Sequence, residues 1–362
     1  MYKSLQACRA FAALIVLLYH SGGIIASERY FGVAGFGVPF AFGGAGVEFF
    51  FVLSGFIIYH AHRRNVSQPG RLAHYARKRF ARIYPTYWIV FFGVLGLALA
   101  TPALRATVDY DAATLVKALL LLPLDKTVVG GTGAPVVTVA WTLQYEMVFY
   151  AFFALMILNR WIAAALVLCF VAGYIALAGD PAPAFPWSFI FRNYTWLFLF
   201  GMGTAMACVR WQVPVRSALR WAAFGAGVFA LTAAVNIADP DITESRKILL
   251  YGIASACMVF GLVQAENAGR SLLAHPFLQL LGDASYALYL VHYPMLSVLC
   301  KIFAAIGLPA LGALGALIAF VGLVVACVGA AIAFHLLLER PLVRLISRKG
   351  KPLPVPAAQP AA

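Results

Sequence analysis

The first apolar stretch of the chain is RAFAALIVLLYH, from Arg9 to His20, with a cation at its start and an imidazole near its end. The two residues lie 11 positions apart, which corresponds to about three full turns of an α-helix. In a helix both side chains therefore face the same way, roughly 16 Å apart along the axis. The spacing predicts one helix face that joins a cation to a titratable ring.

The composition predicts that this stretch crosses a membrane. Of the 362 residues, 63% are hydrophobic and 11% are charged, whereas a soluble domain is about half apolar and about a quarter charged. The apolar residues form long blocks rather than alternating segments, which favours helices over a β-barrel. We predict an all-α, polytopic helical membrane protein. Because the first block continues to Ile25 and others follow, we interpret it as a span rather than as a signal peptide.

About ten transmembrane helices are expected. The apolar segments cover residues 5–25, 44–62, 83–101, 139–158, 161–179, 193–209, 218–237, 247–265, 284–304 and 311–337. A further segment, ATLVKALLLLPL at 113–124, is too short to span a bilayer and ends beside a proline. We expect it to be an interfacial or re-entrant piece of the connection between the third and fourth spans.

The basic residues predict the orientation in the membrane. Most of the 27 lysines and arginines fall in alternate connections between spans, and basic connections mark the cytoplasmic side. With ten spans, both termini are then cytoplasmic. The net charge of +14 is a cytoplasmic surplus that requires no nucleic acid partner. The end of the chain, 347–362, is rich in proline and alanine and is expected to be a disordered cytoplasmic tail.

Few ionisable residues lie within the expected spans, where they are costly and therefore candidates for function. They are His20, Glu48, Glu146 and His292. A carboxylate beside a histidine orients the ring and stabilises imidazolium, which suits general base catalysis. Either Glu48, at a depth similar to that of His20, or the deeper Glu146 is expected to partner His20. His292 fits a hydrogen-bonded core histidine as well as a catalytic one.

A second group of candidates is cationic. Arg79 and Arg82 stand three positions apart, on one face of a helix, directly before IYPTYW re-enters the membrane. Guanidinium groups suit bidentate phosphate binding, and Arg9 adds a third at the same membrane surface. The six cysteines stand singly without ligand spacing, so no metal site is expected.

Six motifs follow one another along the chain. They are RAFAALIVLLYH (9–20), GVEFFFVLSGFII (46–58), RFARIYPTYW (79–88), WTLQYEMVFY (141–150), LGDASYALYLVHYPML (281–296) and ERPL (339–342). In this order they resemble the acyltransferase-3 family of bacterial integral-membrane O-acyltransferases, which includes acetylases of O-antigen and exopolysaccharide. The resemblance covers about residues 1–346, the expected membrane acyltransferase domain. Some relatives carry an appended C-terminal hydrolase-like domain, and we expect none here.

The resemblance implies an activity and a location. The activity is transfer of an acyl group, acetyl by default, from cytoplasmic acyl-CoA to a hydroxyl of a cell-surface or lipid-linked carbohydrate. The expected location is the bacterial inner membrane. Acyl-CoA is then the co-substrate, and a glycan acceptor and membrane lipids are the partners. The family's arginine and histidine pattern falls on Arg9 and His20, and its RxxR pair falls on Arg79 and Arg82.

Two chemical roles are open for His20 at this point. It could take the proton of the acceptor hydroxyl as a general base, or carry the acyl group itself as a covalent intermediate. The three arginines are expected at the CoA phosphates. Candidate contacts to the substrate or to a developing oxyanion are Ser54, Tyr286, Tyr289 and His292.

Two other classes of function use the same buried charges. A transporter of an anionic or lipid-linked sugar would use them as a substrate path, although no internal repeat supports that interpretation. A membrane sensor or scaffold without catalytic activity is the third interpretation. Covalent transfer of label from acyl-CoA to an acceptor separates the first class from the other two.

Overall fold

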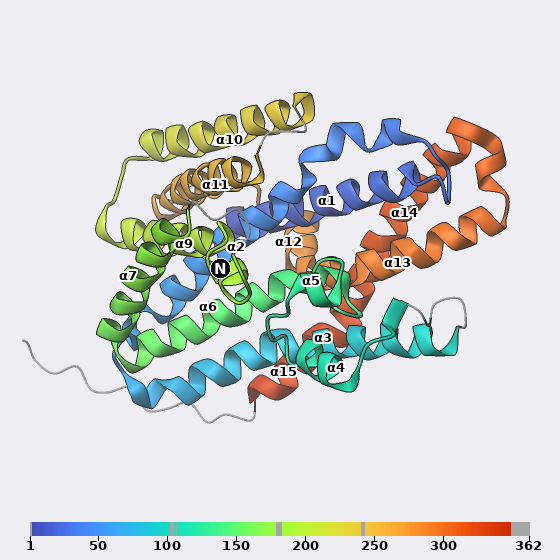
Figure 1. Ribbon diagram of the computed structural model, residues 1–362. Helices are drawn as coiled ribbons and strands as arrows, with labels where there is room; N and C mark the ends of the chain where they lie inside the picture. Colours follow the sequence, from blue (N-terminus) through green and yellow to red (C-terminus); the bar gives the residue numbers. More distant parts are fainter. Residues whose placement is uncertain (1, 102–104, 106, 179–182, 240–242, 349–362) are drawn as a thin grey trace, which may run out of the picture.

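The computed structural model describes the chain except for residues 1, 102–104, 106, 179–182, 240–242 and 349–362. All regular elements of the described residues are helices (Figure 1), which confirms the all-α prediction. The expected disordered tail lies almost wholly outside the described residues. Only its first two positions, 347 and 348, are described, and they are the last residues of the final helix.

Ten helices correspond to the ten expected spans. They are α1 (Lys3–Ala26), α2 (Ala45–His62), α3 (Leu72–Ala100), α6 (Trp141–Leu158), α7 (Arg160–Ala176), α9 (Tyr194–Arg210), α10 (Val215–Ala238), α11 (Glu244–Asn267), α13 (Ser285–Ala305) and α14 (Gly312–Phe334). Among the described residues, eight helical segments are long and apolar enough to cross a membrane. The other two expected spans fall on α7 and α9, which have 17 residues each.

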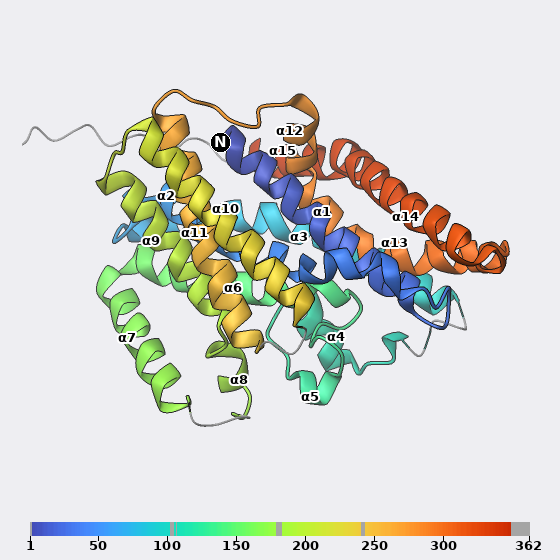
Figure 2. The ribbon, with the colours of Figure 1, turned by 90° about the horizontal axis from the view of Figure 1, so that it is seen from above.

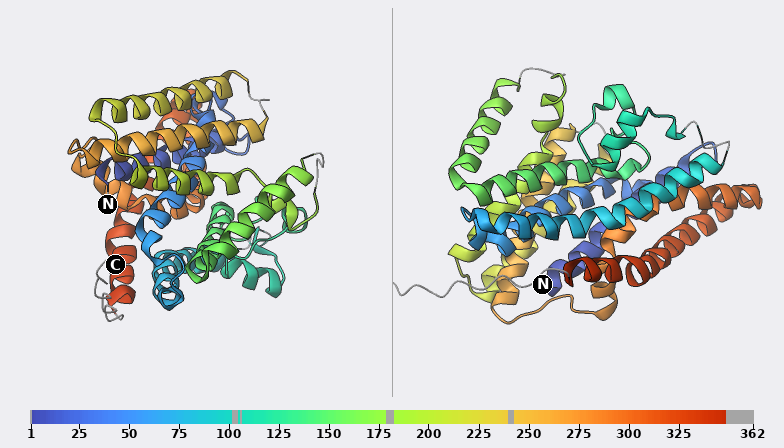
Figure 3. Two further views of the ribbon diagram at one scale, coloured as in Figure 1. Left: turned by 90° about the vertical axis from the view of Figure 1, so that its left-hand side faces the viewer. Right: turned by 90° about the horizontal axis from the view of Figure 1, so that it is seen from below.

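Helix α1 lies in the middle of the bundle. Seen from above, it runs between the α10–α11 pair on one side and the α13–α14 pair on the other (Figure 2). Helices α3 and α6 lie next to each other across the face seen from below (Figure 3, right). The central position of α1 explains how its two functional candidates can each meet side chains from several other helices.

One end of the bundle brings together segments that the distribution of basic residues assigns to the same side of the membrane. The backbone N–H of Lys3 donates to Glu266 at the end of α11 (3.0 Å). The side chain of Gln279 in α12 (Pro276–Asp283) donates to the Lys3 carbonyl (3.0 Å). These contacts place the start of α1, the end of α11 and α12 together, as the expected topology requires. That this end faces the cytoplasm stays a prediction.

The short segment at 113–124 contains α4 (Ala112–Leu119), which packs against α3. Tyr84, Tyr87 and Trp88 of α3 donate side-chain hydrogen bonds of 2.8–3.0 Å to the carbonyls of residues 118–120. The last carbonyls of a helix have no partner within it, so these three aromatic residues fix the end of α4. The other short helices are α5 (Lys126–Val129), α8 (Trp187–Ile190) and α15 (Arg340–Arg348).

Glycines allow α2 and α9 to pack backbone to backbone. A Cβ atom on Gly201 of α9 would lie 2.0 Å from the Val52 carbonyl oxygen of α2, and one on Gly55 of α2 would lie 2.2 Å from the Phe198 carbonyl oxygen of α9. Small residues at such positions are what let membrane helices approach closely. The α2–α9 contact holds α2 against the rest of the bundle.

We expect Gly201→Ala to destabilise the protein by about 1–3 kcal/mol, because the added methyl group meets backbone that cannot move aside. Thermal unfolding in detergent should show a lower melting temperature. Gly203→Ala is the matched control, since no atom lies within 4 Å of a Cβ there. Equal melting temperatures for the two variants would contradict this account of the α2–α9 contact.

Candidate active site

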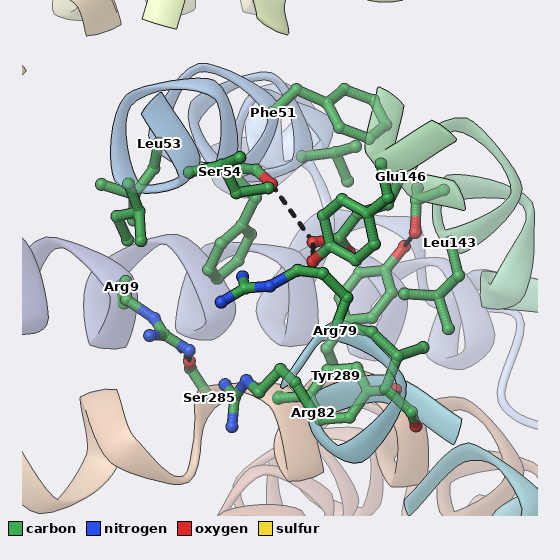
Figure 4. A pocket seen from close by; sticks show the side chains of 18 residues that line it. Arg9, Phe51, Leu53, Ser54, Arg79, Arg82, Leu143, Glu146, Ser285 and Tyr289 are labelled. Carbon is green, nitrogen blue, oxygen red and sulfur yellow. Dashed lines mark hydrogen bonds between the residues drawn. The ribbon is translucent and has the colours of Figure 1, made fainter. Parts of the chain in front are cut away.

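The three predicted arginines lie in one cavity, which we call the arginine cavity. Residues of five helices line it. Its charged and hydroxyl lining includes Arg9 (α1), Ser54 (α2), Arg79 and Arg82 (α3), Glu146 (α6) and Ser285 (α13). Figure 4 shows the three guanidinium groups directed into the same space. With three cations and one carboxylate in its wall, the cavity favours an anionic ligand.

Two of the three arginines are held by protein acceptors. Arg9 donates from Nε and Nη2 to the Ser285 hydroxyl, at 3.2 and 3.0 Å. Arg82 Nη1 donates to Glu339 Oε1 at 2.8 Å, and the other oxygen of Glu339 contacts His335 Nδ1 at 2.8 Å. Glu339 is 1% exposed, so this network fixes both the carboxylate and the guanidinium it holds.

Arg79 differs from the other two because its Nε is buried without a hydrogen-bond partner. Its guanidinium carbon lies 5.9 Å from the ring centre of Tyr75 and 5.6 Å from that of Tyr150. Both distances are within the range of cation–π attraction. Aromatic rings therefore hold Arg79 in place, and its Nε has no protein acceptor.

Glu146 belongs to the arginine cavity. It accepts hydrogen bonds from the Ser54 hydroxyl at 3.2 Å and from the Tyr150 hydroxyl. No hydrogen bond joins it to His20 in the part of the chain that the structure describes. Of the two carboxylates expected to partner His20, this one lies instead among the arginines.

A second cavity, which we call the histidine cavity, adjoins the first. Its lining includes His20 (α1), Glu48 (α2), Thr132, Thr138, Trp141 and Tyr293. Val47 and Tyr289 line both cavities, so the two cavities meet at these side chains. The Tyr289 hydroxyl donates to the Val139 carbonyl (3.0 Å) and accepts from the Thr142 hydroxyl (3.0 Å), and these two hydrogen bonds hold Tyr289 in place.

The histidine cavity contains a pair of imidazoles. His20 Nδ1 lies 3.0 Å from His292 Nε2, and His292 Nδ1 lies 3.0 Å from the Leu288 carbonyl oxygen. A carbonyl can only accept, so His292 carries its proton on Nδ1 and its Nε2 is an acceptor when the ring is neutral. His20 must then donate from Nδ1. This leaves His20 Nε2 unprotonated, the state that a general base needs.

His292 therefore occupies the place that either Glu48 or Glu146 was expected to occupy. It is 1% exposed and lies on α13. The sequence left its role open between a core residue and a catalytic one. The two histidines are 272 positions apart, and no spacing rule connects residues on helices so distant in the chain.

Glu48 lies in the first turn of α2 and lines the histidine cavity, but no hydrogen bond joins it to His20 among the described residues. The start of α2 lies against α1 because Gly46 has no side chain. A Cβ there would lie 2.4 Å from the Ala12 carbonyl oxygen. Glu48 is 8% exposed, and its Oε2 has no hydrogen-bond partner.

The three hydroxyls considered as oxyanion donors all donate to protein acceptors. Ser54 donates to Glu146, Tyr286 to the Ile83 carbonyl at 3.0 Å, and Tyr289 to the Val139 carbonyl. In this arrangement they shape the cavities and fix neighbouring helices. A hydroxyl would have to exchange its partner to stabilise an oxyanion.

Several residues of the site were not singled out as site residues from the sequence. Ser285 and Glu339 hold two of the arginines, and Tyr150 contacts both Arg79 and Glu146. Each of these residues lies within one of the six motifs, and Glu339 begins the ERPL motif. Membership of a motif was therefore the feature of the sequence that could have identified them as site residues. No group of three or more His, Cys, Asp or Glu suited to a metal ion occurs among the described residues.

Comparison with known proteins gives an independent finding. The sequence pattern of an acyltransferase domain family matches residues 2–336. The chain is 33% identical over 319 residues to the exopolysaccharide production protein ExoZ of Rhizobium meliloti (strain 1021), covering 85% of this chain and 92% of ExoZ. It is 33% identical over 134 residues to protein 2 in the picA locus of Rhizobium radiobacter, covering 33% of this chain and 66% of that protein. No solved structure matches the chain significantly.

Proposed function

The chain belongs to this acyltransferase family, and we propose that it transfers an acyl group from acyl-CoA to a hydroxyl of a carbohydrate. We take the acyl group to be acetyl, and residues 1–346 to be the catalytic domain in a bacterial inner membrane with both termini cytoplasmic. The name of the relative ExoZ, an exopolysaccharide production protein, supports a saccharide acceptor. The long apolar helices support a multi-pass membrane protein.

The observation that carries the proposal is the pair of adjoining cavities. One presents three guanidinium groups and the other an imidazole, with Val47 and Tyr289 between them. Acyl-CoA is a polyanion whose thioester lies at the end of a long, narrow arm. Arginines suit its phosphates, and the neighbouring imidazole suits the reaction at the thioester.

In the proposed reaction His20 acts as the general base. Its Nε2 takes the proton of the acceptor hydroxyl while the hydroxyl oxygen attacks the thioester carbonyl carbon. When the tetrahedral adduct collapses, the carbon–sulfur bond breaks and the imidazolium returns the proton to the departing sulfur. The products are an ester of the sugar and free CoA. His292 keeps His20 in the required tautomer because its Nε2 accepts a hydrogen bond from His20 Nδ1–H.

Reconstituted protein supplied with acetyl-labelled acetyl-CoA and a saccharide acceptor tests the proposal. We expect release of free thiol that depends on the saccharide, and label joined covalently to it. A protein that moves the saccharide across the bilayer without releasing thiol is a transporter. A protein that neither binds nor turns over acetyl-CoA is a sensor or scaffold. Either result would overturn the acyltransferase assignment.

A further inference from the structure

We propose that the histidine cavity binds the acceptor as a single sugar ring, and that Glu48 accepts hydrogen bonds from the hydroxyls of that ring. The inference rests on the proposed function, because it assigns the acceptor of that reaction to a place. It gives Glu48 a role in binding the substrate rather than in orienting His20.

The size of the cavity limits what it can hold. Its volume is about 140 Å³. In another protein a cavity of about 150 Å³ holds one benzene ring, which has half the heavy atoms of a hexopyranose. The space therefore holds at most one sugar ring. Tyr19 and Tyr293 line it and are 41% and 38% exposed, so the rest of a longer glycan can leave past them.

The lining combines aromatic faces with a few polar groups. Trp141, Tyr194 and Tyr293 supply flat apolar surfaces, and Thr132 and Thr138 supply hydroxyls. Binding sites for small polar molecules are built in this way, from apolar walls with a few polar groups that fix orientation. A pyranose has apolar C–H faces and polar hydroxyls at its rim, which matches these walls.

Glu48 supplies the observation that points to a ligand. It is more than nine-tenths buried, and its Oε2 has no hydrogen-bond partner. Buried polar groups are nearly always paired, and leaving a carboxylate oxygen unpaired is costly. A sugar hydroxyl in the cavity would provide the missing donor. His20 lines the same cavity, so in this proposal a ring held by Glu48 presents its remaining hydroxyls to the base.

The test compares variants that differ in the carboxylate. We expect Glu48→Gln to raise the KM for the methyl glycosides of glucose, galactose or mannose by ~10–100-fold, as expected for a lost hydrogen bond to a charged acceptor. Glu48→Asp should retain part of the affinity. Glu28→Gln is the matched control, because Glu28 is exposed, lies in the connection after α1 and does not line the cavity.

Direct binding separates this inference from the proposed function. Titration calorimetry with the same glycosides should show binding to wild type that Glu48→Gln loses, whether or not acetyl-CoA is turned over. If a glycoside binds but acetyl-CoA is ignored, the sugar site stands and the acyltransferase proposal fails. If acetyl-CoA is turned over and none of the three glycosides binds, the sugar site is wrong. An equal loss of acetyl-CoA affinity in Glu48→Gln would also overturn it.

The single-ring limit has its own test. With a linear trisaccharide as the acceptor, we expect acetyl groups on a terminal ring, located by the chemical shifts of the ring protons. Acetylation of the middle ring would show that the cavity accommodates an internal unit and would overturn the limit.

Discussion

His20→Gln is expected to lower kcat/KM for transfer to a saccharide by ~10²–10⁴-fold, which is the usual contribution of a general base. Glutamine keeps a hydrogen-bonding side chain at the position but cannot take a proton. The Kd for acetyl-CoA should stay within about twofold of wild type, because His20 does not line the arginine cavity. Thiol release measures kcat/KM. Calorimetry with acetyl-CoA, in the absence of a saccharide, measures the Kd.

His74→Gln is the matched control, because His74 lies on α3 and lines neither cavity. A rate for His20→Gln equal to that of this control would remove His20 from the mechanism. The same preparation decides between the two chemical roles of His20. Wild type and His20→Gln are each incubated with labelled acetyl-CoA and no acceptor, and covalently bound label is measured. Label on wild type that His20→Gln lacks means that His20 carries the acyl group; no covalent label on wild type means that His20 is a base.

The His20–His292 hydrogen bond predicts that the two residues act as a unit. His292→Phe removes the acceptor that fixes the tautomer of His20, and the double variant should be no slower than His20→Gln alone. His292→Gln, whose amide oxygen can accept from His20 Nδ1, should recover part of the rate. Additive losses would mean that His292 acts only through packing.

The sequence predicted the helices well and the contacts between them poorly, for one physical reason. In lipid each helix must satisfy its own backbone hydrogen bonds, so apolar length locates spans without any knowledge of tertiary structure. Which helix faces meet depends on packing. The close approach at Gly46, for example, brings Glu48 near the part of α1 that carries Val16 and His20. That this position requires a glycine is visible only once α1 lies against it.

The candidate site shows the same division. The structure brings Arg9, Arg79 and Arg82 together in one cavity. The sequence indicated this, because all three were expected at the same membrane surface. The hydrogen-bond partner of His20 could not be predicted from motif order and charge. Carboxylates were favoured for chemical reasons, and the structure places Glu146 with the arginines and His292 next to His20. Pairing across 272 positions is decided by how α1 and α13 pack.

The arginine cavity predicts which guanidinium contributes most to donor binding. Arg9 and Arg82 already donate to Ser285 and Glu339, whereas Arg79 Nε is buried without a partner. A hydrogen bond from a charged donor contributes about 1.5–3 kcal/mol. Arg79→Gln should therefore raise the Kd for acetyl-CoA by ~10–100-fold, more than the same change at either other position.

Two comparisons make this expectation specific to the phosphates. Arg77→Gln removes the same charge two positions away on α3 without touching the cavity, so it should bind acetyl-CoA as wild type does. S-acetylpantetheine carries the thioester and its arm but lacks the phosphates, so Arg79→Gln and wild type should bind it equally well. Equal weakening of both ligands by Arg79→Gln would mean that Arg79 shapes the cavity rather than binding an anion. Equal acetyl-CoA affinity in Arg79→Gln and Arg77→Gln would place the phosphates elsewhere.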